Sequence, residues 1–161
     1  MIASPTLGFM LRHPAHFIAL GFGAGLSPWA PGTFGTLVAI PIALGLRRYA
    51  GDLEYGLVLV LLFGLGVWAS QVTGRALGKP DHGSIVIDEV VAFLLVLFFT
   101  GVTPERMAVA FALFRFFDIV KPPPIRQLDA RMKSGLGVML DDLLAAGFAL
   151  LVFAIGHRLL G

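Results

Sequence analysis

The stretch at residues 84–101, SIVIDEVVAFLLVLFFTG, decides the fold class, because most of it has the composition of a membrane-buried helix. Asp88 and Glu89 nevertheless stand side by side near its start. One carboxylate at the centre of a membrane helix costs roughly 2.5–3.5 kcal/mol on insertion scales. Two adjacent carboxylates in such a stretch therefore require a reason beyond packing.

The composition of the whole chain indicates the same environment. Of the 161 residues, 57% are hydrophobic and 14% are charged, and the mean hydropathy is +0.88. Soluble domains carry about 25% charged residues, so we expect one integral membrane domain over residues 1–161. A net charge of +2, without a basic run interleaved with aromatics, argues against nucleic acid as a partner. The absence of cysteine excludes disulfides, thiolate nucleophiles and Cys-based metal sites.

Apolar segments separated by polar loops predict an all-α protein, a polytopic membrane helical bundle of about four to five spans. An N-terminal interfacial or re-entrant helix is expected over residues 7–26, because Arg12, His13, Pro14 and His16 interrupt it. The expected spans are residues 36–46, 55–70, 84–101, 105–120 and 138–160. The expected loops are residues 27–36, 71–84 and 121–137, and in the last of these Pro122, Pro123 and Pro124 oppose continuation of the helix.

The distribution of basic residues orients these spans. With the loops at 71–84 and 121–137 on one side, that side holds seven basic residues and the other holds four. The two sets are Arg12, Arg75, Lys79, Lys121, Arg126, Arg131 and Lys133 against Arg47, Arg48, Arg106 and Arg158. The positive-inside rule therefore predicts that both loops face the cytoplasm.

Five acids fall at the predicted cytoplasmic ends of three spans. They are Asp88, Glu89, Asp118, Asp141 and Asp142. Taken singly, each can be explained as a helix cap or a solvated helix end, and Asp141 and Asp142 suit the first turn of a helix, where the macrodipole favours acids. Asp118 does not fit this explanation, because it stands at the C-terminal end of its span. Their shared level indicates a common site.

Two basic residues accompany the acids. Arg115, Asp118 and Lys121 are spaced i, i+3 and i+6, which places the first two on one helix face and Lys121 just beyond the helix. If both bases pair with acids, about three negative charges remain uncompensated, which requires protons or a cation. Oxygen ligands without cysteine favour Mg²⁺. Carboxylates, a hard cation and Arg or Lys together suit phosphate chemistry.

The loop SPWAPGTFGT at residues 27–36 supplies further candidates. Ser27, Thr33 and Thr36 precede or open an apolar helix whose first N–H groups can cradle a phosphate. A plain turn with Pro31 near a helix start explains the loop equally well. His82 can be a proton donor, a ligand or an ordinary loop residue, and its spacing alone favours the last.

Four blocks of this sequence resemble, in order, the signature blocks of phosphatidylglycerophosphatase A. They are GFGAGLSPWAPGTFGTL, DHGSIVIDEVVAF, FRFFDIVKPPPI and MLDDLLAAG, which run from residue 21 to residue 147. The resemblance implies a Mg²⁺-dependent enzyme of the bacterial inner membrane that dephosphorylates phosphatidylglycerophosphate to phosphatidylglycerol. The family pattern has glycine at the positions of Ala92 and Ala146, and both changes replace one small residue with another.

The resemblance also implies roles for individual residues, and our hypothesis combines it with the clustering of the acids. The expected metal ligands are Asp88, Glu89, Asp118, Asp141 and Asp142. The expected catalytic residues are Asp88, Glu89, Asp118, Asp142 and His82, with one carboxylate as base or nucleophile and His82 as the acid for the leaving glycerol oxygen. The expected substrate-binding residues are Arg115, Lys121, Ser27, Thr33, Thr36 and Asp81. Attack by water and formation of an aspartyl-phosphate both stay open.

Three other classes of membrane protein compete with this interpretation. CDP-alcohol phosphotransferases carry a D-x-x-D-G-x-x-A-R pattern that this sequence lacks. Histidine-based lipid phosphatases need motifs that DHGS does not supply. An ion- or proton-coupled transporter would use intramembrane acids, but these acids gather at one end of the helices. The expected partners are therefore a membrane phospholipid substrate and the bilayer, with the active site on the cytoplasmic side.

Overall fold

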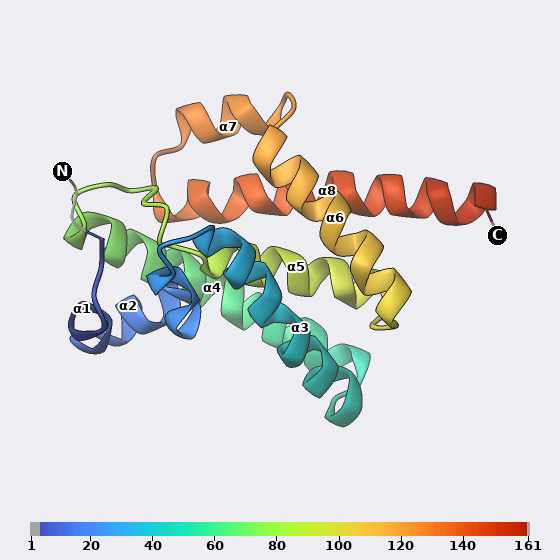
Figure 1. Ribbon diagram of the computed structural model, residues 1–161, viewed down its shortest axis with the longest axis horizontal. Coiled ribbons are helices and arrows are strands. Elements are labelled where there is room, and N and C mark those ends of the chain that lie inside the picture. The colour runs from blue at the N-terminus through green and yellow to red at the C-terminus, as the bar shows by residue number, and fades with distance from the viewer. Residues whose placement is uncertain (1–3, 161) are drawn as a thin grey trace.

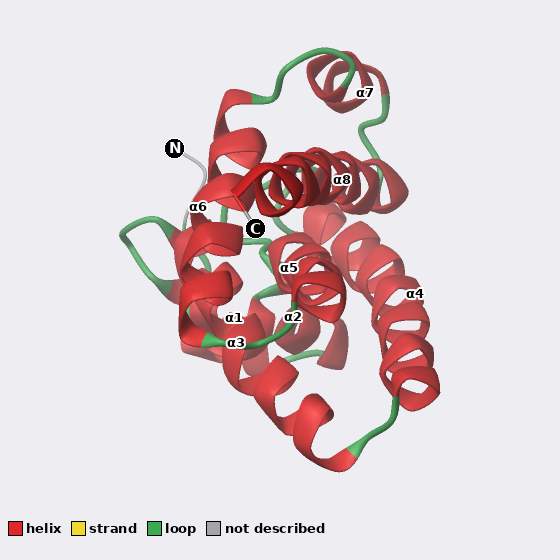
Figure 2. Ribbon diagram, turned by 90° about the vertical axis from the view of Figure 1, so that its right-hand side faces the viewer, coloured by secondary structure: helices red, strands yellow, loops and turns green. Residues whose placement is uncertain are grey.

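The computed structural model describes residues 4–160, and the regular secondary structure in this part is entirely helical (Figure 1). The elements are α1 (Leu7–Leu11), α2 (Pro14–Ala19), the 3₁₀ helix η1 (Gly21–Leu26), α3 (Pro31–Tyr49), α4 (Asp52–Ala76), α5 (Ile87–Thr100), α6 (Pro104–Val120), α7 (Ile125–Arg131) and α8 (Gly135–Leu160). The predicted all-α class is confirmed. Figure 2 shows α5 enclosed by longer helices.

Helix α5 is the centre of the bundle and carries most of the stretch that indicated the fold class. It contacts α3, α4, α6 and α8, and ten of its 14 residues are buried. A helix that is apolar on all sides is stable only when it is surrounded. At 1.5 Å per residue α5 is about 21 Å long, shorter than the roughly 30 Å hydrocarbon layer. Its apolar surface is therefore covered mainly by other helices.

Within residues 4–160, two helices are long and apolar enough to cross a membrane, namely α4 and residues 135–159 of α8. Their outward surfaces expose large apolar side chains, including Leu57, Val60, Leu61, Trp68, Leu151, Ile155 and Leu159. Water-soluble monomers rarely expose broad apolar patches, so these helices support association with a membrane. The count of four to five spans stays a prediction.

The N-terminal part differs from the expected single helix at residues 7–26. It consists of α1, α2 and η1, because the chain changes direction between them. His13 caps α2 by accepting a hydrogen bond from the Ala15 N–H at 3.1 Å, and Pro14 occupies the first helical turn. Inside η1, Phe22 and Gly23 have φ values of 60° and 111°, which end helical continuation. A 2.9 Å hydrogen bond between His16 Nδ1 and Thr73 Oγ1 joins α2 to α4.

All three expected loops contain helix, since α4 continues to Ala76 within the loop at 71–84. Helix α3 begins at Pro31, so the second half of the loop at 27–36 is helical. In the loop at 121–137, the prolines end α6 but are compatible with the start of α7, since the Pro124 carbonyl accepts hydrogen bonds from the Gln127 and Leu128 N–H groups. Ile125 of α7 is fully buried, and α7 packs on α8. The prolines prevent α6 from continuing, as predicted, but the expectation of a loop throughout residues 121–137 was wrong, because α7 lies within it.

Candidate active site

The five acids singled out in the sequence meet in the structure, from three helices. One group of carboxylates contains Asp88, Asp141 and Asp142, and a second contains Glu89, Asp118 and Asp142. Within each group, one oxygen from every residue lies within 4.8 Å of the others. Asp142, which belongs to both groups, is 2% exposed. The sequence therefore predicted the gathering of these acids correctly.

The depth of the acids along their helices corrects the sequence interpretation. Asp141 and Asp142 do not open α8, because this helix begins at Gly135 and has no acid in its first turn. Asp88 and Glu89 instead occupy the first turn of α5. A favourable macrodipole contributes only about 0.3–1 kcal/mol at exposed sites, whereas unpaired buried charge costs several kcal/mol. The helix dipole therefore does not account for the cluster.

Two basic side chains contact the cluster at the positions expected from their spacing. Arg115 forms an ion pair with Asp118 on its own helix, and its Nη1 lies 3.8 Å from Glu89 Oε1. Lys121 follows the end of α6 in a left-handed conformation, and its Nζ lies 2.5 Å from Asp141 Oδ2. Burial lowers the pKa of Lys121, but the hydrogen bond and charge of Asp141 outweigh burial and raise it overall. Lys121 therefore stays protonated.

Several carboxylate oxygens in the cluster have no partner among the described residues. They are Asp88 Oδ1, Glu89 Oε2 and Asp142 Oδ2, and all three are buried. Five carboxylates offset by two cations leave a formal charge of −3. Buried acceptors without donors are costly, and oxygen-only ligands suit a hard divalent cation. The residues present therefore fit Mg²⁺.

The start of α3 packs against the same acids. A Cβ atom at Gly32 would overlap the Glu89 carboxylate and would come within 3.3 Å of Arg115 Nη1, so any larger residue here would have to displace the Glu89 side chain. Ala30, in the left-handed region with φ 45°, turns the chain into α3. The Thr33 and Phe34 N–H groups are bonded to the Ala30 carbonyl, which reduces the donors that the expected phosphate cradle can offer.

The hydroxyl groups expected to bind substrate take part in local structure. Ser27 donates to the Trp29 carbonyl at 2.8 Å and accepts from the Trp29 N–H at 3.3 Å. Thr36 is fully buried and donates to the Gly32 carbonyl at 2.8 Å, while Thr33 lies half-buried in the first turn of α3. Their roles in substrate binding stay predictions.

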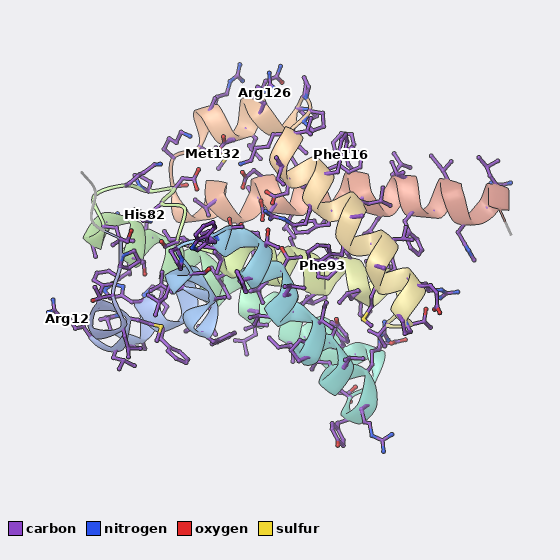
Figure 3. All side chains as sticks on the ribbon, in the orientation of Figure 1. Arg12, His82, Phe93, Phe116, Arg126 and Met132 are labelled. Atoms are coloured by element: carbon purple, nitrogen blue, oxygen red, sulfur yellow. The ribbon has the colours of Figure 1, made fainter. Side chains whose placement is uncertain are left out.

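Figure 3 places His82 on the loop between α4 and α5. Its Nδ1 accepts a hydrogen bond from the Ser84 N–H at 3.2 Å, so in the neutral ring the proton sits on Nε2. Burial and the charge of Lys79 lower the pKa of His82, and the charge of Asp81 opposes them. A cavity of about 240 Å³ is lined by His82, Ser84, Ser27 and Pro31, among others.

No hydrogen bond or ion pair within the described residues joins His82 to the five carboxylates. Asp81 is half-buried on the same loop and lies within Coulombic range of Asp141. The catalytic role of His82 and the binding role of Asp81 stay predictions.

Sequence reasoning missed two residues at this site. Gly32 touches Glu89 and Arg115, but a glycine after a proline indicates only a helix start. Asp129 Oδ1 lies 3.7 Å from Lys121 Nζ and 3.6 Å from Lys133 Nζ. Its i, i+4 spacing to Lys133 was a usable signal, whereas its contact with Lys121 depends on how α7 folds back.

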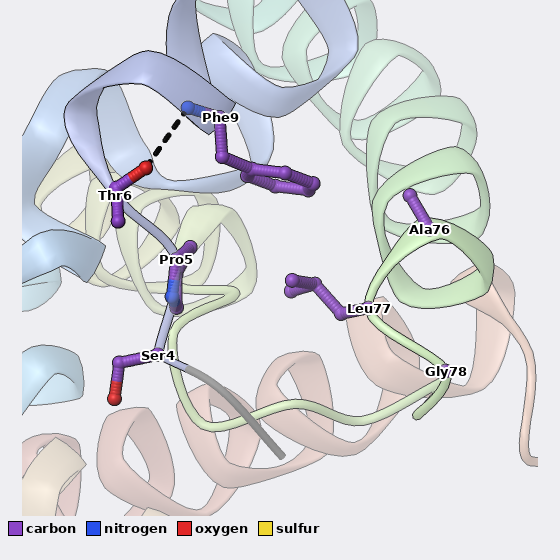
Figure 4. Close-up of a pocket in the computed structure, with 7 residues that line it drawn as sticks. All are labelled: Ser4, Pro5, Thr6, Phe9, Ala76, Leu77 and Gly78. Carbon is purple, nitrogen blue, oxygen red and sulfur yellow. Dashed lines mark hydrogen bonds between the residues drawn. The ribbon is translucent and has the colours of Figure 1, made fainter.

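A larger cavity, of about 440 Å³, lies elsewhere (Figure 4). It is lined by Ser4, Pro5, Thr6, Phe9, Ala76, Leu77 and Gly78. None of the five clustered acids lines it, and its lining offers no ionisable side chain. Size alone therefore does not identify the site.

The fold and the site together define a class of protein, a helical-bundle enzyme whose buried carboxylates and paired cations suit phosphate chemistry. The sequence model of the family described as Phosphatidylglycerophosphatase A matches residues 17–157. The chain belongs to this family and is an enzyme of the phosphatase class, as its motifs predicted.

Individual relatives agree over nearly the whole chain. The chain is 42% identical to a phosphatidylglycerophosphatase A of Haemophilus influenzae, over 98% of each protein. It is 38% identical to one of Escherichia coli, over 92% of this chain and 87% of the relative. A Bacteroides thetaiotaomicron protein, named provisionally as a phosphatidylinositol-3-phosphatase, is 36% identical over 89% of this chain and 94% of its own length. No solved structure matches, and the transporter alternative has no support from these relatives.

Proposed function

We propose that this protein hydrolyses the terminal phosphate monoester of phosphatidylglycerophosphate, giving phosphatidylglycerol and inorganic phosphate during phospholipid biosynthesis. The observation that carries the proposal is the group of unpartnered buried carboxylate oxygens beside Arg115 and Lys121. The names of the two relatives above supply the substrate.

Asp88, Glu89, Asp118, Asp141 and Asp142 would hold Mg²⁺, which when bound supplies Lewis-acid polarisation of phosphoryl oxygens. Support for this assignment comes from the three carboxylate oxygens that have no protein donor. Asp141 is the most engaged of the five, because Oδ2 contacts Lys121 and Oδ1 accepts from the Asp142 N–H at 3.0 Å.

Arg115 and Lys121 would bind the phosphate of the substrate, which carries about −1.5 to −2 charge at neutral pH. Arg115 can present two parallel N–H donors to phosphate oxygens. Because Arg115 lies beside Gly32, the start of α3 is on the same side of the carboxylate cluster as this guanidinium. Such prepositioned cations stabilise the charge that develops in the transition state.

One of the five carboxylates would serve as the base for water or as the nucleophile, and both routes fit the site. His82 would act as the acid for the leaving glycerol oxygen in its imidazolium form, donating from Nε2 and ending as the neutral ring, which requires Nδ1 to release the Ser84 N–H. This step requires the loop between α4 and α5 to bring His82 to the bound substrate, because the His82 ring is bonded to Ser84 of its own loop and, among the described residues, not to any of the five carboxylates.

The proposed location is the bacterial inner membrane, as a multi-pass protein with the active site on the cytoplasmic side. Supporting this, the long apolar part of α8 continues beyond Asp142, and the outward faces of α4 and α8 are apolar. Lipid tails can therefore stay in the bilayer while the headgroup phosphate reaches the carboxylates.

The test is phosphate release by the purified full chain in detergent micelles containing phosphatidylglycerophosphate, phosphatidylinositol 3-phosphate or phosphatidic acid. We expect the fastest release from phosphatidylglycerophosphate, loss of release with a chelator, and recovery when Mg²⁺ is added back. Faster release from phosphatidylinositol 3-phosphate would reassign the substrate. No release from any of these lipids with any divalent metal would overturn the proposal.

A further inference from the structure

We propose that the cluster holds two divalent cations, which share Asp142 as a common ligand. This inference rests on the proposed metal-dependent phosphatase function and extends it, because that function leaves the number of cations open.

The carboxylates of the cluster are arranged in two groups. Asp88 and Asp141 form one group with Asp142, and Glu89 and Asp118 form the other with Asp142. Asp142 alone belongs to both. Its own two oxygens allow one carboxylate to serve two neighbouring cations.

Residues with unpartnered carboxylate oxygens occur in both groups. Asp88, whose Oδ1 is unpartnered, belongs to the first group, Glu89, whose Oε2 is unpartnered, belongs to the second, and Asp142, whose Oδ2 is unpartnered, belongs to both. Asp88 is 7% exposed and Asp142 is 2% exposed, so water does not replace the missing donors easily. Each group therefore contains its own unsatisfied acceptor as well as the shared one.

Two cations also account for the adjacency of Asp88 and Glu89 on α5. Consecutive residues on a helix point about 100° apart, so the pair cannot serve a single point equally. In the structure they fall into different groups. The adjacent acids of α5 thus supply one ligand to each of two cations.

The formal charge of the cluster also favours two cations. Five carboxylates with Arg115 and Lys121 leave a formal charge of −3. With one divalent cation the site stays at −1, and a phosphate dianion would bring it to −3. With two cations the site becomes +1 before the phosphate binds and −1 afterwards. Because unbalanced charge is costly in a buried site, two cations lower the electrostatic cost of binding a phosphate dianion.

The two groups also have matching basic neighbours. In the first group Asp141 contacts Lys121, and in the second Asp118 and Glu89 lie beside Arg115. The second group is the one that borders Gly32. Each proposed cation therefore has one protein cation nearby to share the charge of the phosphate.

The test measures binding of Mn²⁺ to the purified full chain in detergent, by equilibrium dialysis and by electron paramagnetic resonance. We expect two Mn²⁺ per chain at saturation and a spin-coupled spectrum, because the two ions share a ligand. Asp142→Asn should abolish the coupled spectrum, and Glu89→Gln should reduce the stoichiometry from two to one. Asp52→Asn, an exposed acid paired with Arg47 at the start of α4, is the matched control and should keep two coupled ions.

One Mn²⁺ per wild-type chain with an uncoupled spectrum, together with metal-dependent phosphate release, would overturn the two-cation inference and keep the proposed function. No specific binding together with metal-independent release would overturn the proposed metal dependence as well. Circular dichroism establishes whether each variant is folded. Where a variant does not fold, the number of Mn²⁺ ions bound per wild-type chain still decides between one cation and two.

Discussion

Asp142 is the most central of the five clustered acids. It is almost fully buried, one of its oxygens has no partner among the described residues, and it joins both groups of carboxylates. Its neighbour Asp141 has both oxygens engaged. Two adjacent residues of the same type therefore have different roles, because one is satisfied by protein donors and the other is not.

The geometry of Arg115 gives a test at the residue scale. Arg115→Lys keeps the positive charge but removes the planar pair of donors, so we expect kcat/KM for the lipid substrate to fall about ten- to a hundredfold. This range corresponds to one charged hydrogen bond of about 1.5–3 kcal/mol. Steady-state kinetics measure it. Arg126→Lys, at an exposed position on α7 (Figure 3), is the control and should match wild type.

An Arg115→Lys enzyme with unchanged kcat/KM would show that Arg115 serves only to neutralise Glu89 and Asp118. Binding of the phosphate would then fall to other groups.

At the scale of elements, the site depends on the close approach of α3 to α5. Gly32→Ala would place a methyl group on the Glu89 carboxylate. We expect activity to fall by about a hundredfold, the scale of loss that a displacement of about 1 Å can cause, while the chain still folds. Phosphate release and circular dichroism measure the two effects.

The matched control lies on the same helix. A Cβ atom at Gly45 meets nothing within 4 Å, so Gly45→Ala should keep full activity and stabilise the helix by about 0.5–1 kcal/mol. Equal activities of the two variants would contradict the role given to the start of α3.

The elements also show what the sequence can and cannot predict. The pairing of Arg115 with Asp118 follows from helical spacing and was predictable. The start of α8 was placed too late, although Ser134 is a plausible helix cap and its Oγ accepts from the Gly137 N–H at 3.3 Å. The contact of Gly32 with Glu89 joins residues far apart in the chain, and local pattern carries no information about such an approach.

At the scale of the whole molecule, the claim is that the loop between α4 and α5 and the segment containing α7 lie on one side of a membrane. The chain has no cysteine, so single cysteines report location without background. We expect Lys79→Cys and Arg126→Cys to react with an impermeant thiol reagent in inside-out vesicles only. If α3 and α8 end on the opposite side of the membrane, Arg48→Cys and Arg158→Cys should not react with the reagent in inside-out vesicles.

Labelling of Lys79→Cys in intact cells with a permeable outer membrane would contradict the cytoplasmic location of the site. Labelling of all four positions from the same side would contradict the spanning arrangement itself. Exposed apolar surface on α4 and α8 would then need another covering partner.

The most direct test of the central claim is phosphate release from phosphatidylglycerophosphate by wild type, Asp142→Asn and Asp52→Asn, each with Mg²⁺ and with a chelator. The account predicts Mg²⁺-dependent release by wild type and Asp52→Asn. It predicts at least a hundredfold slower release by Asp142→Asn, because loss of a cation ligand removes several kcal/mol of transition-state stabilisation. Release by Asp142→Asn at the wild-type rate would contradict the claim that the buried carboxylates are the active site.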